Sequence, residues 1–446
     1  MVNVEEDILL LNKVILAPMV RGSDLAFRQM IRKYGIQHCY SPMLRAAEVI
    51  DSYNVWMQEV EHQQDQSTMT IGNDTLKKVR HEDGILFLTD ICQLFHHPQR
   101  KHPKNDTTTN LLTVQLCGGC PKELYQAVKI VLQMKDEYPT EERLIGIDLN
   151  LGCPQKCAKD GGFGAYLQPP SMAASCISSM KRAINDHTTK NIRLSCKIRL
   201  LDSLEDTIAF SKQLVQAGCD IIALHCRHRS DIQHNSPPDL MTAQKVIQAL
   251  SPIPIIINGT EYNTITLSRI KHILQQTKAH SIMIARDFLI NPYRLVPSSS
   301  NHNHDPEHLA AVYLEHCKKY PPPSYLYIQK HLRWIFRPYL QQQQQIDYND
   351  WKVRLWTFLV RPYIQSIFQF QQFVLLYIKL NGSMNNIPPS LQHQPEPSFQ
   401  SIRHHREPPI IQTIKNQYYD TNFSFDNEHD NIITNDNEME NASEVL

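Results

Sequence analysis

Short apolar runs alternate with amphipathic segments between residues 14 and 285. Several runs are continuously apolar, as in strands that are buried on both faces. The pattern predicts strands at 14–16, 38–41, 112–116, 146–149, 195–199, 221–225, 255–257 and 282–285, and helices at 25–34, 123–134, 172–184, 204–217, 243–250 and 265–276. Eight strands with intervening helices favour an α/β fold of the (β/α)8 barrel type, a TIM barrel. A doubly wound sheet is the alternative, although no Gly-x-Gly-x-x-Gly motif follows the first strand.

Three further regions fall outside this alternation. Residues 60–110 exceed what a strand–helix unit needs, and 96–110 is polar and basic, which is typical of an exposed loop. Residues 297–304 are typical of a linker, and helical spacing returns at 306–319, 325–340 and 351–380. We therefore expect a barrel domain over 1–296, a helical domain over 305–380 and a polar tail without regular structure over 381–446.

Composition and charge narrow the class of protein only slightly. Lys and Arg together equal Asp and Glu at 45 each, so net charge indicates no partner, although a local basic face is compatible with RNA binding. The N-terminus is acidic where a signal peptide needs basic residues, and no apolar run is long enough to span a bilayer. We expect the eleven cysteines to be reduced thiols of a cytoplasmic or nuclear protein. No metal site is predicted.

The turn at residues 150–154 is the strongest chemical signal in the chain. An apolar run ends there in Asn150 and Cys153, followed by Pro154 and a glycine-rich segment at 161–165. A strand that ends in such a turn presents a reactive group at the mouth of an α/β enzyme. The thiol is a candidate nucleophile, a candidate general acid or an inert cysteine. Cys157 follows four residues later and is a candidate disulfide partner.

Cationic and amide side chains follow the later strands. Lys197 at a barrel mouth needs an anion or an electron-rich acceptor such as reduced flavin, unless it pairs with Asp148. The basic cluster at 227–229 suits the phosphates of a nucleic acid or a solvated loop. The turns at 258–260 and 284–286 fit a phosphate monoester, through backbone N–H groups and one arginine.

Taken together, these segments resemble the tRNA-dihydrouridine synthase family, in the family's order over residues 14–295. The matching residues are 16–20 with 23–28, 39–43, 114–115, 148–164, 196–199, 225–227, 258–259, 283–286 and 291–292. The Asn-x-Gly-Cys-Pro run with its downstream Gly-Gly-x-Gly-Ala is the specific part, whereas Ala-Pro-Met is shared with other FMN barrels. Residues 17–21 and 40–43 look most like the eukaryotic enzymes that act on the tRNA D-loop, particularly on its adjacent extra uridines.

The resemblance implies that an FMN-binding barrel and a tRNA-binding helical domain together reduce uridine to 5,6-dihydrouridine, with NADPH or NADH as reductant. Hydride would pass from the flavin to C6 of a flipped uridine, and Cys153 would protonate C5. That role needs a neutral thiol, so the pKa of Cys153 should not be strongly lowered. The substrate contacts implied are Asn150, Arg199 and Arg227. The FMN contacts implied are Pro18, Met19, Val20, Gln115, Lys197, His225, Asn258, Gly259, Thr260, Ala285 and Arg286. No protein partner is implied.

Two residues depart from the family pattern. Cys226 stands where the family usually has glycine, and its side chain is expected to crowd the flavin or a phosphate. Asp287 stands where glycine commonly follows Ala-Arg, and its carboxylate would repel a nearby phosphate unless it turns away.

Two other functions remain open from the sequence. One is an FMN-dependent dehydrogenase of a free pyrimidine, which the basic residues and the added helical domain argue against. The other is an RNA-binding protein without flavin chemistry, which Cys153, Lys197 and Arg286 argue against. Flavin absorbance near ~450 nm in the purified protein would exclude the latter.

Overall fold

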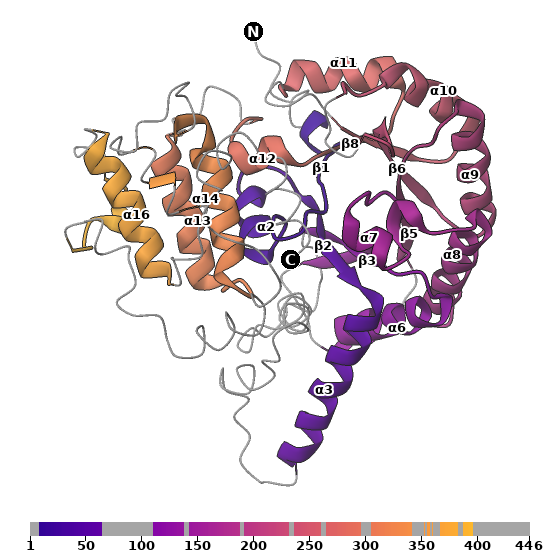
Figure 1. Ribbon diagram of the computed structural model, residues 1–446, viewed down its shortest axis with the longest axis horizontal. Coiled ribbons are helices and arrows are strands. Elements are labelled where there is room, and N and C mark those ends of the chain that lie inside the picture. The colour runs from indigo at the N-terminus through magenta and orange to yellow at the C-terminus, as the bar shows by residue number, and fades with distance from the viewer. Residues whose placement is uncertain are drawn as a thin grey trace, which may run out of the picture.

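Eight parallel strands form a closed barrel in chain order, and β1 is hydrogen-bonded to β8 (Figure 1). The computed structural model describes residues 9–64, 110–137, 142–187, 191–231, 236–259, 265–295, 305–340, 352, 355–356, 359, 366–381 and 387–395. The strands are β1 (Val14–Leu16), β2 (His38–Arg45), β3 (Leu111–Cys117), β4 (Arg143–Asn150), β5 (Arg193–Leu200), β6 (Ile221–His228), β7 (Ile255–Asn258) and β8 (Ser281–Ile284). Each strand lies where an apolar run predicted it. The (β/α)8 barrel is confirmed, and a doubly wound sheet is excluded because such a sheet stays open.

Helices follow the strands and cover the outside of the barrel (Figure 1). The longer ones are α2 (Leu25–Arg32), α3 (Ala46–Gln64), α6 (Pro121–Glu137), α8 (Pro170–Asn185), α9 (Leu204–Gln216), α10 (Leu240–Leu250) and α11 (Leu267–Thr277). Helix α3 was not predicted. It begins directly after β2 and projects from the barrel, and the exposed loop expected at 96–110 lies outside the described residues except for Asn110.

The barrel interior explains why polar residues gather at one end. Its apolar layer consists of Ile15, Ala17, Tyr40, Ala223, Ile256 and Met283. Side chains alternate along a strand, so the residue two positions further on points to the same side. From Ala223, Ile256 and Met283, that step leads to His225, Asn258 and Ala285, which line the cavity described below.

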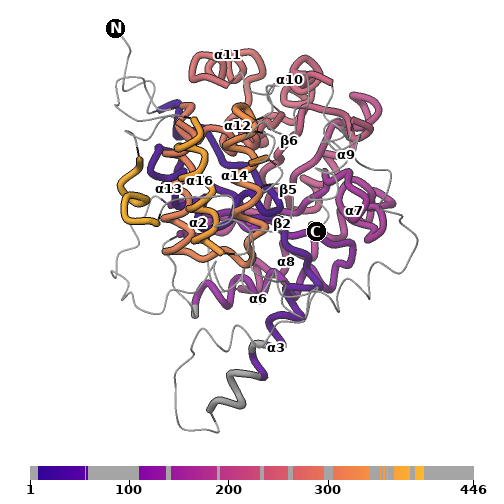
Figure 2. The backbone as a smooth tube through the Cα atoms, turned by 60° about the vertical axis from the view of Figure 1, so that its left-hand side comes forward, coloured from indigo at the N-terminus to yellow at the C-terminus, as the bar shows by residue number. Residues whose placement is uncertain are grey.

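A small helical domain packs beside the barrel, on the side of α2 and α12 (Arg286–Ile290) (Figures 1 and 2). It contains α13 (Pro306–Lys319), α14 (Tyr325–Leu340) and α16 (Ile367–Leu380), all within the spans of predicted helical spacing. The segment assigned to the tail includes a 3-10 turn, η3 (Pro389–Leu391), in which Leu391 is buried. The tail from residue 396 lies outside the described residues. None of the described helices is long and apolar enough to cross a membrane.

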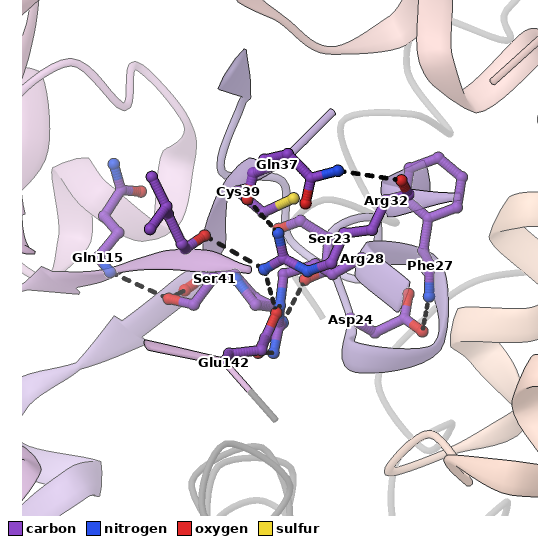
Figure 3. Close-up of polar contacts among 12 residues, drawn as sticks. Ser23, Asp24, Phe27, Arg28, Arg32, Gln37, Cys39, Ser41, Gln115 and Glu142 are labelled. Atoms are coloured by element: carbon purple, nitrogen blue, oxygen red, sulfur yellow. Dashed lines mark hydrogen bonds and ion pairs between the residues drawn. The ribbon is translucent and has the colours of Figure 1, made fainter. Parts of the chain in front are cut away.

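Buried charge anchors helix α2 to the strands. Arg28 and Arg32 share the carboxylate of Glu142, which precedes β4, and Arg28 Nη2 lies 2.7 Å from Glu142 Oε2 (Figure 3). All three side chains are buried. Burial alone would raise the pKa of Glu142, but the two guanidinium groups lower it to about 2. The carboxylate therefore stays ionised throughout the physiological pH range.

A second buried carboxylate, Asp24, joins the barrel to the helical domain. Asp24 caps α2, where its Oδ2 accepts the N–H of Phe27 (3.4 Å). The same side chain accepts hydrogen bonds from His331 Nε2 in α14 (2.7 Å) and from the Tyr313 hydroxyl in α13 (3.4 Å). The His331 ring packs on Phe27 and Tyr313, with centroid distances of 4.4 and 4.3 Å. One side chain thus fixes the start of α2 and the position of two helices of the other domain.

Candidate active site

The carboxyl ends of the strands surround a cavity of about 200 Å³. Apolar residues come mainly from the loop after β1, and polar residues come from the other strand ends. The wall consists of Ala17, Pro18, Met19, Val20, Met43, Gln115, Asn150, Gly152, Cys153, Pro154, Gln155, Lys197, Arg199, His225, Asn258, Ala285, Arg286, Leu289, Lys330 and Trp334. This is the end of the barrel at which (β/α)8 enzymes carry out their chemistry.

Asn150 holds the turn that carries Cys153. Its Oδ1 accepts the backbone N–H groups of Gly152 (3.1 Å) and Cys153 (2.9 Å), which makes an Asx turn. From β5, Arg199 Nε donates to the carbonyl of Gly152 (3.0 Å), and its Nη1 donates to the carbonyl of Asp231 (3.0 Å). The backbone around the thiol is therefore fixed from two strands.

A chain of hydrogen bonds ties this turn to the barrel interior. Asn150 Nδ2 donates to Gln115 Oε1 (3.0 Å), and Gln115 Nε2 donates to Asp148 Oδ2 (2.8 Å). Ser195 Oγ donates to the other oxygen of Asp148 (2.5 Å). Burial raises the pKa of Asp148 to about 6, although the hydrogen bonds from Ser195 and Gln115 oppose the rise. The side-chain amides of Asn150 and Gln115 each have one further N–H hydrogen that these hydrogen bonds do not use.

The glycine-rich segment at 161–165 packs closely against Cys153. The carbonyl of Cys153 accepts the N–H of Ala165 (3.0 Å). Gly164 has φ +61°, and a Cβ at that position would lie 2.8 Å from the Cys153 carbonyl oxygen and 3.0 Å from the Cys153 Cβ. Its hydrogen bond with the Cys157 thiol and its burial both raise the pKa of Cys153. The thiol is therefore protonated at neutral pH, which suits a proton donor rather than a nucleophile.

Lys197 faces the cavity without a counter-charge. Among the described residues, none forms an ion pair with its ammonium group, and Asp148 is instead hydrogen-bonded to Gln115 and Ser195. Burial and the nearby Arg199 together lower the pKa of Lys197 to about 8, against the opposing effect of Asp148. A partly desolvated cation in a cavity wall favours an anionic or electron-rich ligand.

His225, Arg227 and Gly259 pack together at the ends of β6 and β7. Gly259 has φ +97°, and a Cβ there would lie 2.6 Å from His225 Cδ2. Arg227 Nη1 lies 3.4 Å from His225 Nε2, while its Nε donates to the carbonyl of Ser236 (2.6 Å). Arg227 therefore supports His225 from outside the cavity wall.

Helix α14 supplies part of the wall that the sequence did not reveal. Lys330 Nζ donates to the carbonyl of Val20 (2.8 Å), and the Arg286 guanidinium lies 5.8 Å from the centre of the Trp334 ring. Lys330 and Trp334 are four residues apart, one helical turn, and so lie on the same face of α14. That spacing was visible in the sequence, but which face of α14 meets the barrel was not.

The structure brings most of the predicted site residues into one wall. Those that line the cavity are Pro18, Met19, Val20, Gln115, Asn150, Cys153, Lys197, Arg199, His225, Asn258, Ala285 and Arg286. Gly259 and Arg227 lie against His225 and not in the wall, and Thr260 lies outside the described residues. Two residues depart from the family pattern. Cys226, in β6, is buried in the large hydrophobic core rather than in the barrel interior, and Asp287 is buried in α12. Neither residue lines the cavity. Cys226 therefore does not crowd the wall as expected, and the Asp287 side chain does not face the cavity.

The fold and the cavity define a (β/α)8-barrel protein that carries, at the carboxyl ends of its strands, a protonated thiol and a lysine with no ion-pair partner in the described part of the chain. The family model described as "Dihydrouridine synthase (Dus)" matches residues 15–75 and 88–354. The chain belongs to this family.

Curated relatives match over much of the chain. A Mus musculus protein named as tRNA-dihydrouridine(16/17) synthase-like is 26% identical over 340 residues, which cover 76% of this chain and 58% of that protein. A Saccharomyces cerevisiae tRNA-dihydrouridine(20a/20b) synthase is 28% identical over 280 residues, which cover 62% of this chain and 60% of the yeast protein. A Caenorhabditis elegans protein named as tRNA-dihydrouridine synthase-like is 26% identical, covering 76% of this chain and 96% of its own. The chain thus spans 58% and 63% of the lengths of the mouse and rat relatives.

Proposed function

We propose that this protein reduces uridine in the D-loop of tRNA to 5,6-dihydrouridine, with FMN as bound cofactor and NAD(P)H as reductant. The observation that carries the proposal is that one cavity wall contains both the protonated Cys153 thiol and Lys197, which has no ion-pair partner among the described residues. The names of the relatives, which contain both tRNA-dihydrouridine synthase and NAD(P)+, support the same reaction.

The residues of the cavity fit FMN. Pro18, Met19 and Val20 offer an apolar surface for a ring system, and Lys197 offers a cation for its electron-rich edge. At Gly259 no side chain fits beside His225, so backbone alone approaches a ligand there. Asn258, Gly259, Thr260, Ala285 and Arg286 would hold the ribityl phosphate, and Gln115 and His225 would contact the ring. When bound, FMN would supply the hydride that is added to C6 of uracil.

The chain's own contribution to the chemistry is a proton and a fixed geometry. Cys153 Sγ donates its proton to C5, which balances the hydride added to C6 and completes the saturation of the bond. The Asn150 side-chain oxygen accepts the N–H groups of the Cys153 turn, and one of its amide hydrogens is donated to Gln115. Its remaining amide hydrogen would be donated to the uracil edge. Arg199 acts through the carbonyl of Gly152, where it positions the thiol.

The helical domain is the proposed tRNA-binding part. It contributes Lys330 and Trp334 to the wall beside Arg286, so an RNA bound along this domain lies next to the cavity. A uridine must leave its stack to reach the thiol, which is easier in a loop than in a duplex. We therefore expect tRNA, rather than free uridine, to be the substrate.

Two variants of the purified protein test the proposal directly. Cys153→Ala should abolish dihydrouridine formation in tRNA while FMN stays bound and is still reduced by NAD(P)H. Cys120→Ala, in the loop after β3, is the matched cysteine control and should retain activity. Normal modification by Cys153→Ala would overturn the assignment of the proton donor.

Cofactor binding and substrate are tested separately. Arg286→Ala should lose FMN on dialysis, while Arg193→Ala, at the opposite end of β5, should keep it. Mapping of dihydrouridine across the tRNAs of cells that lack the protein should reveal D-loop positions that become unmodified. A colourless protein, or a protein that reduces free uridine and leaves tRNA unchanged, would contradict the proposal.

A further inference from the structure

A second thiol, Cys157, lies beside Cys153, and the proposed reaction does not use it. Cys157 is the second residue of α7 (Lys156–Asp160), and Cys153 belongs to the turn before that helix. Both thiols are free and partly exposed, whereas the other free cysteines of the described part of the chain are buried, except Cys120. Cys157 does not line the cavity.

The two thiols share one small packing cluster. Cys153 and Cys157 pack with Met43 and Tyr166 against a buried core of Cys117, Ala158 and Phe163. The segment after α7 folds back over them, because the N–H of Phe163 donates to the carbonyl of Ala158 (3.0 Å) and that of Ala165 to the carbonyl of Cys153 (3.0 Å). The Arg45 guanidinium lies 5.8 Å from the centre of the Phe163 ring. The cluster therefore holds two neighbouring sulfur atoms at the edge of the cavity, close to a cation.

The proton is shared unequally between the two sulfur atoms. The hydrogen bond between the two thiols is the largest of the effects that lower the pKa of Cys157, and together they outweigh burial and bring it to about 7. The smaller effects in the same direction come from the N–H of Ala158 at the start of α7 and from the charge of Arg45. The same hydrogen bond raises the pKa of Cys153. At neutral pH, Cys157 is partly thiolate and Cys153 stays protonated.

We propose that Cys157 is the reactive thiol of this site and that a disulfide oxidant of the glutathione type converts the Cys153–Cys157 pair into an intramolecular disulfide. The Cys157 thiolate attacks one sulfur of the oxidant, forms a mixed disulfide and releases one thiolate. Cys153 then attacks Cys157 Sγ, loses its proton to solvent and releases the second thiolate. The protein dithiol is oxidised by two electrons, and the oxidant is reduced to two thiols.

The consequence for catalysis rests on the proposed function. A disulfide removes the proton of Cys153 that C5 of uracil requires, so the oxidised protein cannot complete the reduction. Reduction by an external dithiol restores both thiols. The glutathione-type oxidant would thus switch dihydrouridine formation off reversibly.

The bond can be detected without an activity measurement. We would treat the full-length protein with glutathione disulfide at pH 7 and digest it with trypsin, which cleaves after Arg143, Lys156 and Lys159. The expected product joins peptide 144–156 to peptide 157–159 by a disulfide. Cys196 and Cys219 are an internal control, because their sulfur atoms are 3.5 Å apart but both side chains are buried. A Cys196–Cys219 product with no Cys153–Cys157 product would overturn the inference.

Variants separate this inference from the proposed function. In Cys157→Ser, the remaining activity should lose its sensitivity to glutathione disulfide, whereas Cys120→Ser should stay as sensitive as the wild type. Iodoacetamide at pH 7 should label Cys157 before Cys153 and Cys120 in the untreated protein. Equal inactivation of Cys157→Ser, or earlier labelling of Cys153, would refute the inference. A protein that forms the disulfide but makes no dihydrouridine would refute the proposed function alone.

Discussion

His331 Nε2 in the helical domain lies 2.7 Å from Asp24 Oδ1 in the barrel, and neither side chain is exposed to solvent. The other ring nitrogen, Nδ1, has no hydrogen-bond partner among the described residues. The imidazole is thus committed to a single polar contact between the two domains. Since Asp24 also caps α2, this contact connects the loop after β1 to α14.

We expect His331→Ala to destabilise the protein by about 3–5 kcal/mol, because it leaves the Asp24 carboxylate buried without its nearest partner. Loss of FMN should accompany the change, since Lys330 and Trp334 are neighbours of His331 on α14. His331→Gln, which can still donate to Asp24, should recover part of the stability. Chemical unfolding and flavin content measure both effects. His272→Ala, on the exposed face of α11, is the control; a loss equal to that of the control would contradict the prediction.

Glu142→Gln should also be strongly destabilising, by about 3–5 kcal/mol at pH 7, because two buried arginines lose their shared counter-charge. The pKa of Glu142 is about 2 in the folded protein and near its ordinary value of 4.5 in the unfolded chain, so the carboxylate's contribution to stability is complete above about pH 4.5. That contribution is lost as the pH falls towards 2. The difference in unfolding free energy between wild type and variant should therefore narrow over this window. Exposed Glu123→Gln is the control, and a difference independent of pH would refute the explanation.

Lys197 should leave a signature in the alkaline range. Its pKa is about 8 in the folded protein, below the ordinary value of 10.5, so the unfolded chain holds more protons between these values. Stability of the ligand-free wild type should therefore rise from pH 8 to 10.5 relative to Lys197→Met, by no more than about 3 kcal/mol. Unfolding curves recorded at several pH values provide the measurement. Parallel pH dependence of the two proteins would show that the lysine is not desolvated.

Gly164 and Gly162 offer a matched pair of substitutions. Both have positive φ, at +61° and +62°, so alanine at either position carries the same backbone strain of about 1 kcal/mol. Only at Gly164 does the added methyl group meet Cys153, whereas nothing lies within 4 Å at Gly162. Gly164→Ala should therefore lose a further 1–3 kcal/mol, roughly, and should slow uridine reduction. Equal rates in the two variants would mean that contact with Cys153 does not set the thiol's position.

Most of the barrel could be predicted from the sequence because its strands are buried on both faces. Continuous apolar runs such as 255–257 and 282–285 predict such strands without any knowledge of tertiary contacts. Helix α3 (Ala46–Gln64) was missed because no element was assigned to residues 46–59, and the insertion was placed only at 60–110. The cavity wall followed from strand ends, since parallel strands bring residues such as Gln115, Lys197 and His225 to one edge.

The contacts that decide each role were not readable from the chain. Asn150 was expected to hold the base. Its side-chain oxygen instead accepts two N–H groups of the turn that carries Cys153, and this contact depends on the conformation of three successive residues. Arg199 was expected near the substrate and is engaged with carbonyls 47 and 32 residues away in the chain. Lys330 and Trp334 were missed because the sequence does not say which face of α14 meets the barrel.

Two adjacent residues of helix α14 make contacts in two different parts of the barrel. Lys330 reaches the carbonyl of Val20 at the cavity, and His331 reaches Asp24 in the core. A helix is stiff over so short a distance, so the two contacts keep a fixed position relative to each other. Any displacement of α14 would therefore change the contact of Lys330 with Val20 and the contact of His331 with Asp24 together.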